Sequence, residues 1–312
     1  MKSLITIVLV AFAVVASAAL NGNITHFVDP ATNLTIKHFN CGVSRASASK
    51  HYNETIRFLS RNTRHSQIGI GTRAPAVVKR QKISPALVIN TYLHLLTTTA
   101  KAGTVTKKQA TAQIATLNRA YKPIGITFKL INVSITTNDA WAVAEGSNMD
   151  AVKEALRKGS YADLNLYFHS DLTGGILGTC TLPSQVTAGM ARSQYASDGC
   201  NINANTMPGG AMTGYNAGMT AVHETGHWLG LLHTFEGYSC TGDGDSIADT
   251  PMQATSTDGC PSEPAKDSCP GVTGVDAIHN YMDYSSDSCY TSFTPGQVTR
   301  IGTLWNQYRK GF

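Results

Sequence analysis

The chain has 312 residues, enough for one or two domains, and only 14% of them are charged. The usual charged fraction is about 25%, so this composition, with 28 glycines, favours a secreted protein. The chain has a formal net charge of +5, and its excess of positive charge lies in residues 19–80, which hold 9 Lys and Arg against 2 Asp and Glu. Residues 81–312 hold 15 against 18, so nucleic-acid binding by this part has no electrostatic support.

The first 18 residues have the pattern of a secretory signal peptide. Lys2 is followed by an apolar run from Leu4 to Val15 and by the small residues Ala16-Ser-Ala18. This run is too short to span a bilayer, which needs about 20 apolar residues, and no later stretch comes close. We therefore expect a secreted, extracellular protein without membrane insertion.

Residues 19–80 are expected to form a pro-segment with little sustained periodicity. It carries three N-glycosylation sequons, at Asn23, Asn33 and Asn53. It ends in Lys79-Arg80, a dibasic pair at which an endoprotease could release a mature chain from Gln81. The alternative is an ordinary solvated basic pair, but the first convincing strand begins soon afterwards.

The following residues predict strands and helices in alternation. The predicted elements are a strand at Leu87–Leu95, a helix from Thr106 to Tyr121, a strand at Ile126–Leu130, a helix from Ser147 to Gly159 and a strand at Leu164–Phe168. A fourth sequon, at Asn132, is expected just beyond the second strand. That end of the strand must be exposed if the sequon is glycosylated.

Residues 223–233 have the spacing H-E-x-x-H-x-x-G-x-x-H. On a helix, His223 and His227 lie one turn apart on the same face, so both can bind one ion. Gly230 can take a positive φ and end the helix, so His233 arrives from a new direction. Three imidazoles leave one tetrahedral position open for water, which is typical of a catalytic zinc site.

Glu224 directly follows the first histidine, so its carboxylate lies near the metal but does not ligate it. Zinc lowers the pKa of a bound water from about 15.7 to about 7, and Glu224 can accept the proton and pass it to the leaving amine. The motif therefore predicts peptide-bond hydrolysis with Glu224 as general base. A catalytically silent binding module would be expected to have lost Glu224 or a histidine, and all are present.

Three further stretches accompany the histidine motif: His233-Thr-Phe235, Gly244-Asp-Ser-Ile-Ala-Asp-Thr-Pro251 and His279-Asn-Tyr-Met-Asp-Tyr-Ser-Ser-Asp-Ser-Cys289. The histidine motif is that of metzincin metallopeptidases. With these stretches, the chain after residue 80 resembles the pappalysin family, in its branch of small secreted extracellular metalloproteases. Thr234 and the Asp249-Thr-Pro251 run argue against a matrixin or an astacin.

The resemblance implies a metzincin fold of the α+β class. An α/β-type upper subdomain, residues 81–233, would hold a twisted mixed sheet and two long helices, the second starting near Ala217. The lower subdomain, residues 234–312, would be irregular and stapled by disulfides, with a C-terminal helix starting at the capping box Thr294-Pro-Gly-Gln297. Gly174–Thr181 would form an antiparallel edge strand that binds an extended polypeptide as an extra strand.

Seven cysteines leave one without a partner if the others are oxidised. Cys41 stands alone ahead of residue 80, and the other six allow 15 pairings that the sequence alone does not resolve. The resemblance implies an interlaced pattern among the last four. The implied pairs are Cys240 with Cys269, Cys260 with Cys289, and Cys180 with Cys200.

The resemblance also implies roles for three residues of the last stretch. Met282 would form the Met-turn under the zinc ligands, and Tyr284 would stabilise the oxyanion of the tetrahedral intermediate. Asp287 would line the pocket for the residue after the scissile bond and favour Arg or Lys there. The alternatives are a packed aromatic for Tyr284 and a solvated loop aspartate for Asp287.

Cys41 is a candidate for latency, because a thiolate is a strong zinc ligand and could displace the catalytic water. Cys41-Gly42 resembles the cysteine-glycine of matrixin pro-segments, although Asn40 stands where those have an arginine. The alternative is a free or externally paired thiol.

Calcium is a further candidate cofactor. Hard oxygen ligands are available from Asp243, Asp245, Asp249 and the Thr250 carbonyl, and related pappalysins carry calcium near here. The alternative is a solvated acidic loop. Taken together, the sequence predicts a secreted endopeptidase of extracellular proteins with one catalytic zinc ion, made as a latent precursor.

Overall fold

The computed structural model of the protein describes residues 27–28, 35–36, 39–68, 82–187 and 189–312. The expected signal peptide, the sequons at Asn23 and Asn33, and the pair Lys79-Arg80 with Gln81 lie outside the described residues. No helix in the described ranges is both long enough and apolar enough to cross a bilayer.

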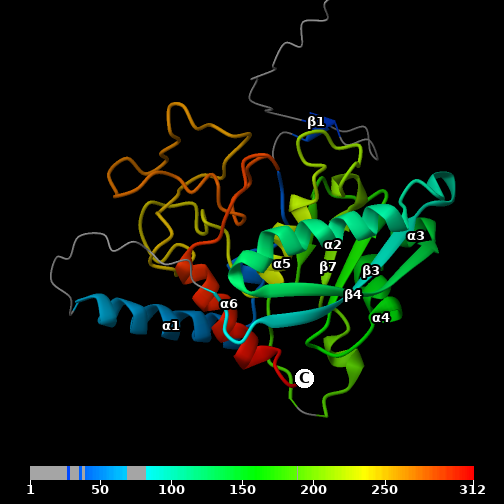
Figure 1. The fold of residues 1–312 in the computed structure, drawn as a ribbon, viewed down its shortest axis with the longest axis horizontal. Helices are drawn as coiled ribbons and strands as arrows, with labels where there is room; N and C mark the ends of the chain where they lie inside the picture. Colours follow the sequence, from blue (N-terminus) through cyan, green and yellow to red (C-terminus); the bar gives the residue numbers. More distant parts are fainter. Residues whose placement is uncertain (1–26, 29–34, 37–38, 69–81, 188) are drawn as a thin grey trace, which may run out of the picture.

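A five-stranded mixed sheet lies on the right of the protein in Figure 1. In spatial order its strands are β4 (Ile126–Thr137), β3 (Leu87–Thr97), β5 (Leu164–His169), β7 (Cys200–Asn203) and β6 (Gly178–Cys180). Neighbouring strands are parallel, except that β6 is antiparallel to β7. The expected antiparallel edge strand is therefore present as β6, although it is shorter than predicted. A separate antiparallel pair joins β1 (Phe27–Val28) to β2 (Thr35–Ile36).

Two helices, α2 (Lys107–Tyr121) and α5 (Met219–Trp228), pack against the sheet and against each other. A capping box starts α2 at the predicted residue: the Thr106 hydroxyl accepts from the Gln109 amide, and the Gln109 side chain accepts from the Thr106 amide. Helix α5 carries the histidine motif and contacts β6 and β7. All ten of its residues are buried.

The short helices α3 (Asp139–Val143) and α4 (Asn148–Leu156) lie between β4 and β5 along the chain. Residues 229–294 form no regular helix or strand before α6 (Pro295–Tyr308). Disulfides staple the chain at three places: Cys180–Cys200, Cys240–Cys269 and Cys260–Cys289. These are the pairs that the resemblance implied, and Cys41 is a free thiol.

Two elements end at a different residue in the structure than the sequence predicted. Strand β4 continues to Thr137, so Asn132 lies inside the strand and not beyond it. The register of β4 against β3 slips after Leu130, which breaks the alternation that the prediction relied on. Helix α4 ends at Leu156 and not at Gly159, because Arg157 leaves the helix to enter a buried ion pair.

The stretch expected to be a pro-segment contains a helix that its weak periodicity did not predict, α1 (Lys50–Ile68). It lies beside α6 (Figure 1), with Tyr52 and Ile56 fully buried. The Tyr52 hydroxyl donates to the Gly230 carbonyl at 2.9 Å, and His51 Nδ1 lies 2.8 Å from the Tyr308 hydroxyl. Because α1 is anchored by so few apolar side chains, its sequence has no broad apolar stripe from which a helix could be predicted.

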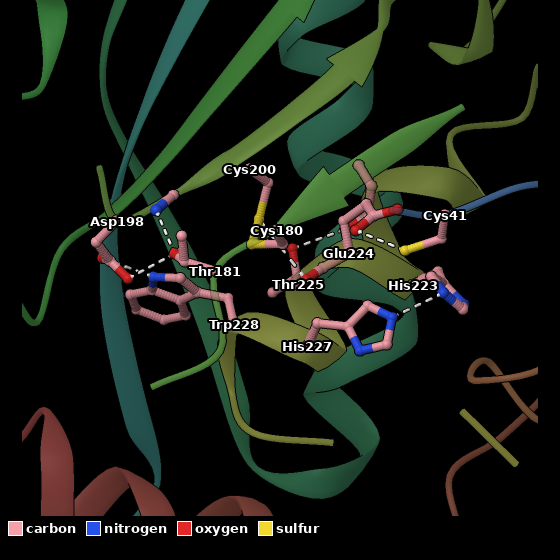
Figure 2. Close-up of a disulfide and its surroundings, with 12 residues drawn as sticks. Cys41, Cys180, Thr181, Asp198, Cys200, His223, Glu224, Thr225, His227 and Trp228 are labelled. Carbon is pink, nitrogen blue, oxygen red and sulfur yellow. Dashed lines mark hydrogen bonds between the residues drawn. A yellow bond between two sulfur atoms is a disulfide. The ribbon is translucent and has the colours of Figure 1, made fainter. Parts of the chain in front are cut away.

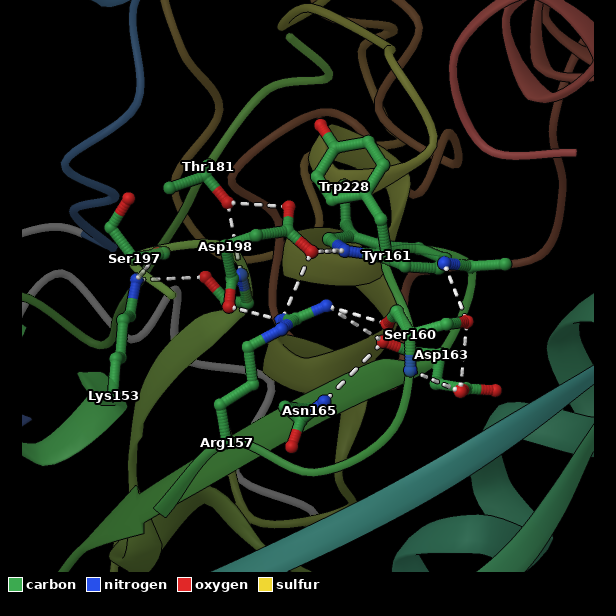
Figure 3. A network of polar contacts seen from close by, with 12 residues as sticks. Lys153, Arg157, Ser160, Tyr161, Asp163, Asn165, Thr181, Ser197, Asp198 and Trp228 are labelled. Atoms are coloured by element: carbon green, nitrogen blue, oxygen red, sulfur yellow. Dashed lines mark hydrogen bonds and ion pairs between the residues drawn. The ribbon is translucent and has the colours of Figure 1, made fainter. Parts of the chain in front are cut away.

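A buried group of charges fixes the end of α5 (Figure 3). The Asp198 carboxylate accepts from Trp228 Nε1 at 3.0 Å, from the two terminal nitrogens of Arg309 at 3.1 and 3.0 Å, and pairs with Arg157 at 3.2 Å. Arg309 also donates to the Trp228 carbonyl and lies 3.6 Å above a Trp228 ring. Burial opposes ionisation of Asp198, but the two arginines outweigh it and lower its pKa.

Replacing Arg309 by Met should lower the free energy of unfolding at pH 7 by about 3–5 kcal/mol, because a buried charge loses a partner. The lowered pKa means that ionised Asp198 stabilises the fold above about pH 4, its ordinary range, and that this stabilisation is lost as the pH falls further. The difference between the two proteins should therefore shrink in acid. Urea unfolding of the two proteins at neutral and at acid pH measures the loss of stability and its dependence on pH. Both proteins carry Glu224→Gln, so that the expected peptidase activity cannot digest them.

Lys101→Met is the matched control, because it removes the partly exposed ion pair with Asp171. Such pairs contribute less than about 1 kcal/mol. Equal losses in the Arg309 and Lys101 variants would contradict the role given to Asp198.

Candidate metal centre and active site

The three histidines of the motif meet at one point beside α5. Helical spacing brings His223 and His227 together, and the turn at Gly230, with φ of 93°, returns the chain so that His233 joins them. His227 Nε2 lies 3.0 Å from His223 Nε2 and 3.1 Å from His233 Nε2. Figure 2 shows the His223 and His227 side chains turned toward each other.

The protonation of the two helical histidines is fixed by backbone carbonyls. His223 Nδ1 donates to the Tyr281 carbonyl and His227 Nδ1 to the Leu231 carbonyl, both at 2.8 Å. Burial lowers the pKa of both rings well below the usual value, so they are neutral and each presents Nε2 as a lone pair. Lone pairs that face each other at 3.0 Å need a cation between them. The donor set therefore fits a metal ion, and three imidazoles suit zinc.

Glu224 lies between α5 and the edge strand β6. Its Oε2 accepts from the Cys41 thiol at 3.4 Å, and its Oε1 has no hydrogen-bond partner within the described part of the chain. A Cβ at Gly178 would lie 2.5 Å from Oε1, so only glycine fits on β6 at this point. Burial raises the pKa of Glu224 to about 8. A fully buried carboxylate with one free oxygen thus stands beside the histidines.

Met282 is fully buried and packs against α5. A side chain at Gly226 would clash with its sulfur, so the glycine inside the histidine motif allows this contact. The Met282 carbonyl accepts from the Thr234 amide at 3.2 Å. Tyr281, the residue before Met282, accepts through its carbonyl from His223. The turn at Met282 therefore holds the first histidine directly, and it holds the third through Thr234, the residue after His233.

Cys41 of the pro-segment reaches the same point. Its sulfur and the ligand nitrogens of the three histidines all lie within 4.8 Å of one another. The Tyr284 hydroxyl accepts from the Cys41 amide at 3.0 Å and lies 3.3 Å from its carbonyl. Tyr284 is buried, which raises its pKa. Its ring centre lies 5.0 Å from that of His233.

The backbone around Cys41 also pairs with the edge strand. The Leu177 amide donates to the Asn40 carbonyl at 2.9 Å, and the Gly42 amide donates to the Gly178 carbonyl at 3.1 Å. Cys41 and Gly178 form a parallel bridge. Residues 40–42 therefore lie along the outer side of β6 as an added strand.

Asp287 lies at the beginning of α5. Its Oδ2 accepts from the Ala217 amide at 2.6 Å, which satisfies an otherwise free amide just ahead of the helix. Its Oδ1 has no partner among the residues that the structure describes, and burial raises its pKa to about 7. The structure thus shows a buried carboxylate and not a solvated loop aspartate.

The acidic residues considered for calcium lie apart from the histidines. Asp249 accepts from the Thr294 hydroxyl and the Gly296 amide, both at 2.8 Å, and so caps α6. Asp245 is buried and accepts from the Ile247 amide at 2.9 Å. Among the described residues, the groups close enough to share a metal are the histidines with Cys41, and Cys260, His279 and Cys289, of which two form a disulfide. The three aspartates do not form such a group.

Glu236 was not predicted as a site residue. Its Oε2 lies 3.6 Å from His233 Nδ1, and its Oε1 accepts from the Arg45 amide at 3.0 Å. It therefore contacts both the third histidine and the pro-segment. The only sequence signal is its position three residues after His233, which is too weak to single it out.

Comparisons with known proteins agree with this site. The sequence model of peptidase family M43, described as pregnancy-associated plasma protein-A, matches residues 146–305. An extracellular metalloprotease of Sordaria macrospora is 46% identical over 277 residues, covering 88% of this chain and 90% of that one. Another from Colletotrichum graminicola is 48% identical over 225 residues, covering 72% and 78%.

Solved structures show the same similarity. Mature mirolysin of Tannerella forsythia, in complex with a cleaved peptide, has a TM-score of 0.59 and 28% identity, over 72% of this chain and 93% of that one. A promirolysin variant has a TM-score of 0.61 and 25% identity, over 86% and 94%. The chain therefore belongs to the M43 (pappalysin) family of metallopeptidases, as an extracellular metalloprotease.

Proposed function

We propose that the protein is a secreted zinc endopeptidase that cleaves extracellular proteins and is made as a latent precursor. The observation that carries this proposal is the convergence of three histidine Nε2 atoms beside a buried glutamate. His223, His227 and His233 would hold the zinc ion. When bound, zinc supplies Lewis-acid chemistry, which acidifies a water molecule and polarises the scissile carbonyl.

The protein's own groups supply the remaining steps. Glu224 accepts a proton from the attacking water and later gives it to the leaving amine. The Tyr284 hydroxyl, which now bonds to Cys41, becomes free to donate to the oxyanion when the pro-segment leaves. Met282 packs against α5 at Gly226 and so supports the helix that carries His223 and His227. The backbone groups of Leu177 and Gly178 then bind an extended substrate in place of the pro-segment.

Glu224→Gln should lower kcat/KM for a peptide substrate by about 10²–10⁴-fold or more, because the amide cannot accept the proton. The variant should keep its metal, since Glu224 does not ligate it; metal analysis of the purified protein checks this.

Thr225→Ser is the matched control on the same buried helix, because it keeps the hydroxyl that donates to the Ala221 carbonyl. It should remain active. A Glu224→Gln enzyme with near-normal turnover would overturn the mechanism.

Latency is proposed to rest on Cys41. The signal peptide is placed at residues 1–18 and the pro-segment at 19–80, with cleavage after Lys79-Arg80. Two arrangements support a latent precursor: the Cys41 sulfur lies among the ligand nitrogens, and the neighbouring backbone fills the edge of β6. With zinc bound by the three histidines, the Cys41 thiolate would act as a further ligand and would keep out the water that hydrolysis needs.

Cys41→Ser should give an uncleaved precursor with at least about tenfold more peptidase activity than its parent, because serine is a poor zinc ligand. The comparison is made with Arg80→Ala in both proteins, so that the dibasic pair cannot be cut, and activity is followed with a quenched peptide.

Tyr52→Phe serves as control: it removes the hydrogen bond to Gly230 and leaves the metal centre intact. This variant should stay latent. If the Cys41→Ser precursor is equally latent, the segment inhibits by filling the cleft and not by ligating zinc.

Specificity is proposed to depend on Asp287. A buried carboxylate with an unpartnered oxygen is a strong recognition element for a cationic side chain. We therefore assign Arg or Lys to the position after the scissile bond. Calcium is left out of the proposal, because Asp249 is already engaged in capping α6.

A cleavage profile on a mixed peptide library should show Arg or Lys directly after the cut. Asp287→Asn should reduce kcat/KM for such sites by about 10–100-fold, as expected when one of two paired charges is lost. The exposed Glu263, replaced by Gln, is the control and should leave the profile unchanged. A parent profile dominated by apolar residues at this position would contradict the role of Asp287.

A further inference from the structure

Strand β4 forms the edge of the sheet opposite to β6, with three strands between them. It spans 12 residues and pairs only with β3 among the described strands. One side of its backbone therefore faces outward. Long exposed edges of this kind can pair with another chain and cause aggregation, so proteins protect them.

The first part of this edge is protected by groups of the chain itself. The Asn118 side chain, from α2, donates to the Phe128 carbonyl at 3.0 Å and accepts from the Phe128 amide at 2.8 Å. It thus replaces the missing neighbouring strand at that residue. Lys129 follows with an exposed charge, which also discourages pairing.

The second part of the edge has no such cover. For residues 130–137 we find no hydrogen bond from outside the sheet to the outer backbone within the described structure. Ile131 is 41% exposed and Ile135 is 48% exposed. An uncovered strand with two exposed isoleucines favours edge-to-edge association.

Asn132 lies between the two isoleucines and is itself exposed. It begins the sequence Asn132-Val-Ser134, which is the only N-glycosylation sequon in residues 82–312. We propose that Asn132 carries an N-linked glycan that covers the second half of the β4 edge and prevents association through it. In the attachment step, Asn132 Nδ2 bonds to the first sugar carbon, the bond from that carbon to a lipid pyrophosphate breaks, and the amide proton leaves with the pyrophosphate.

Asn53, the other sequon within the described residues, is placed differently. It lies in α1, and its amide nitrogen is 3.4 Å from both the Arg45 and the Ala48 carbonyls. Its Oδ1 accepts from Arg45 Nε. A glycan on this nitrogen would remove one of its two hydrogens, whereas the Asn132 side chain makes no hydrogen bond to the described residues.

The attachment is tested on the full precursor, carrying Glu224→Gln and secreted from a eukaryotic host. Enzymatic deglycosylation in ¹⁸O-labelled water, followed by peptide mass spectrometry, should show that Asn132 was occupied. Ser134→Thr should keep occupancy, because it retains the sequon and the hydroxyl that bonds to His94. Asn132→Gln should abolish it. Recovery of the parent's Asn132 peptide without sugar would overturn the proposal.

The protective role is tested by light scattering on concentrated protein. Both the Asn132→Gln variant and the folded parent should form oligomers once the parent is deglycosylated with an endoglycosidase that leaves one sugar on Asn132 and creates no charge there. The glycosylated parent should stay dispersed, and the deglycosylated parent covers the case in which the variant is not secreted. Ile135→Lys, which places a charge on the edge, should restore dispersion to deglycosylated protein. Deglycosylated parent that remains as dispersed as before, or oligomers that Ile135→Lys leaves unchanged, would show that the glycan does not protect this edge.

Discussion

The complete burial of α5 is the constraint on which the rest of the structure depends. A short helix with polar histidine and glutamate side chains can be buried only if each of them finds a partner. Carbonyls from two loops fix the rings of His223 and His227. Neighbouring side chains can pack closely around the helix because Gly226 and Gly178 have no side chain. The helix end is held by Asp198 and Arg309. The arrangement of the three histidines is therefore fixed by contacts within the chain.

Residues 39–68, in the proposed pro-segment, make contacts of the kind that an extended substrate requires. Their backbone pairs with β6 through Asn40 and Gly42, and Cys41 lies beside Glu224 (Figure 2). Helix α1 adds a second anchor through Tyr52, which bonds to the carbonyl of the glycine turn between His227 and His233. Residues 40–68 thus contact the candidate site in three ways: through the Cys41 side chain, an added strand and a docked helix.

Features that depend on neighbours in sequence could be predicted, and features that depend on distant partners could not. Helical spacing was enough to bring His223 and His227 together, and the capping boxes at Thr106 and Thr294 begin α2 and α6 as expected. In contrast, Arg157 leaves α4 only because Asp198 lies across the sheet, and α1 is helical because it docks on α6. Asp198 carries no local sequence signal, and that of Glu236 is too weak to single it out. Most residues of the candidate site could thus be predicted from the local sequence, whereas the long-range contacts that hold the site in place could not.

X-ray absorption at the zinc edge, on the purified precursor and the mature enzyme, tests the central claim most directly. The account predicts zinc with three nitrogen neighbours at about 2.0–2.1 Å and one sulfur at about 2.3 Å in the precursor, with the sulfur replaced by oxygen after processing. A precursor spectrum without sulfur would contradict the placement of Cys41. A protein that binds no zinc, or binds it with fewer than three nitrogens, would contradict the assignment of the metal centre itself.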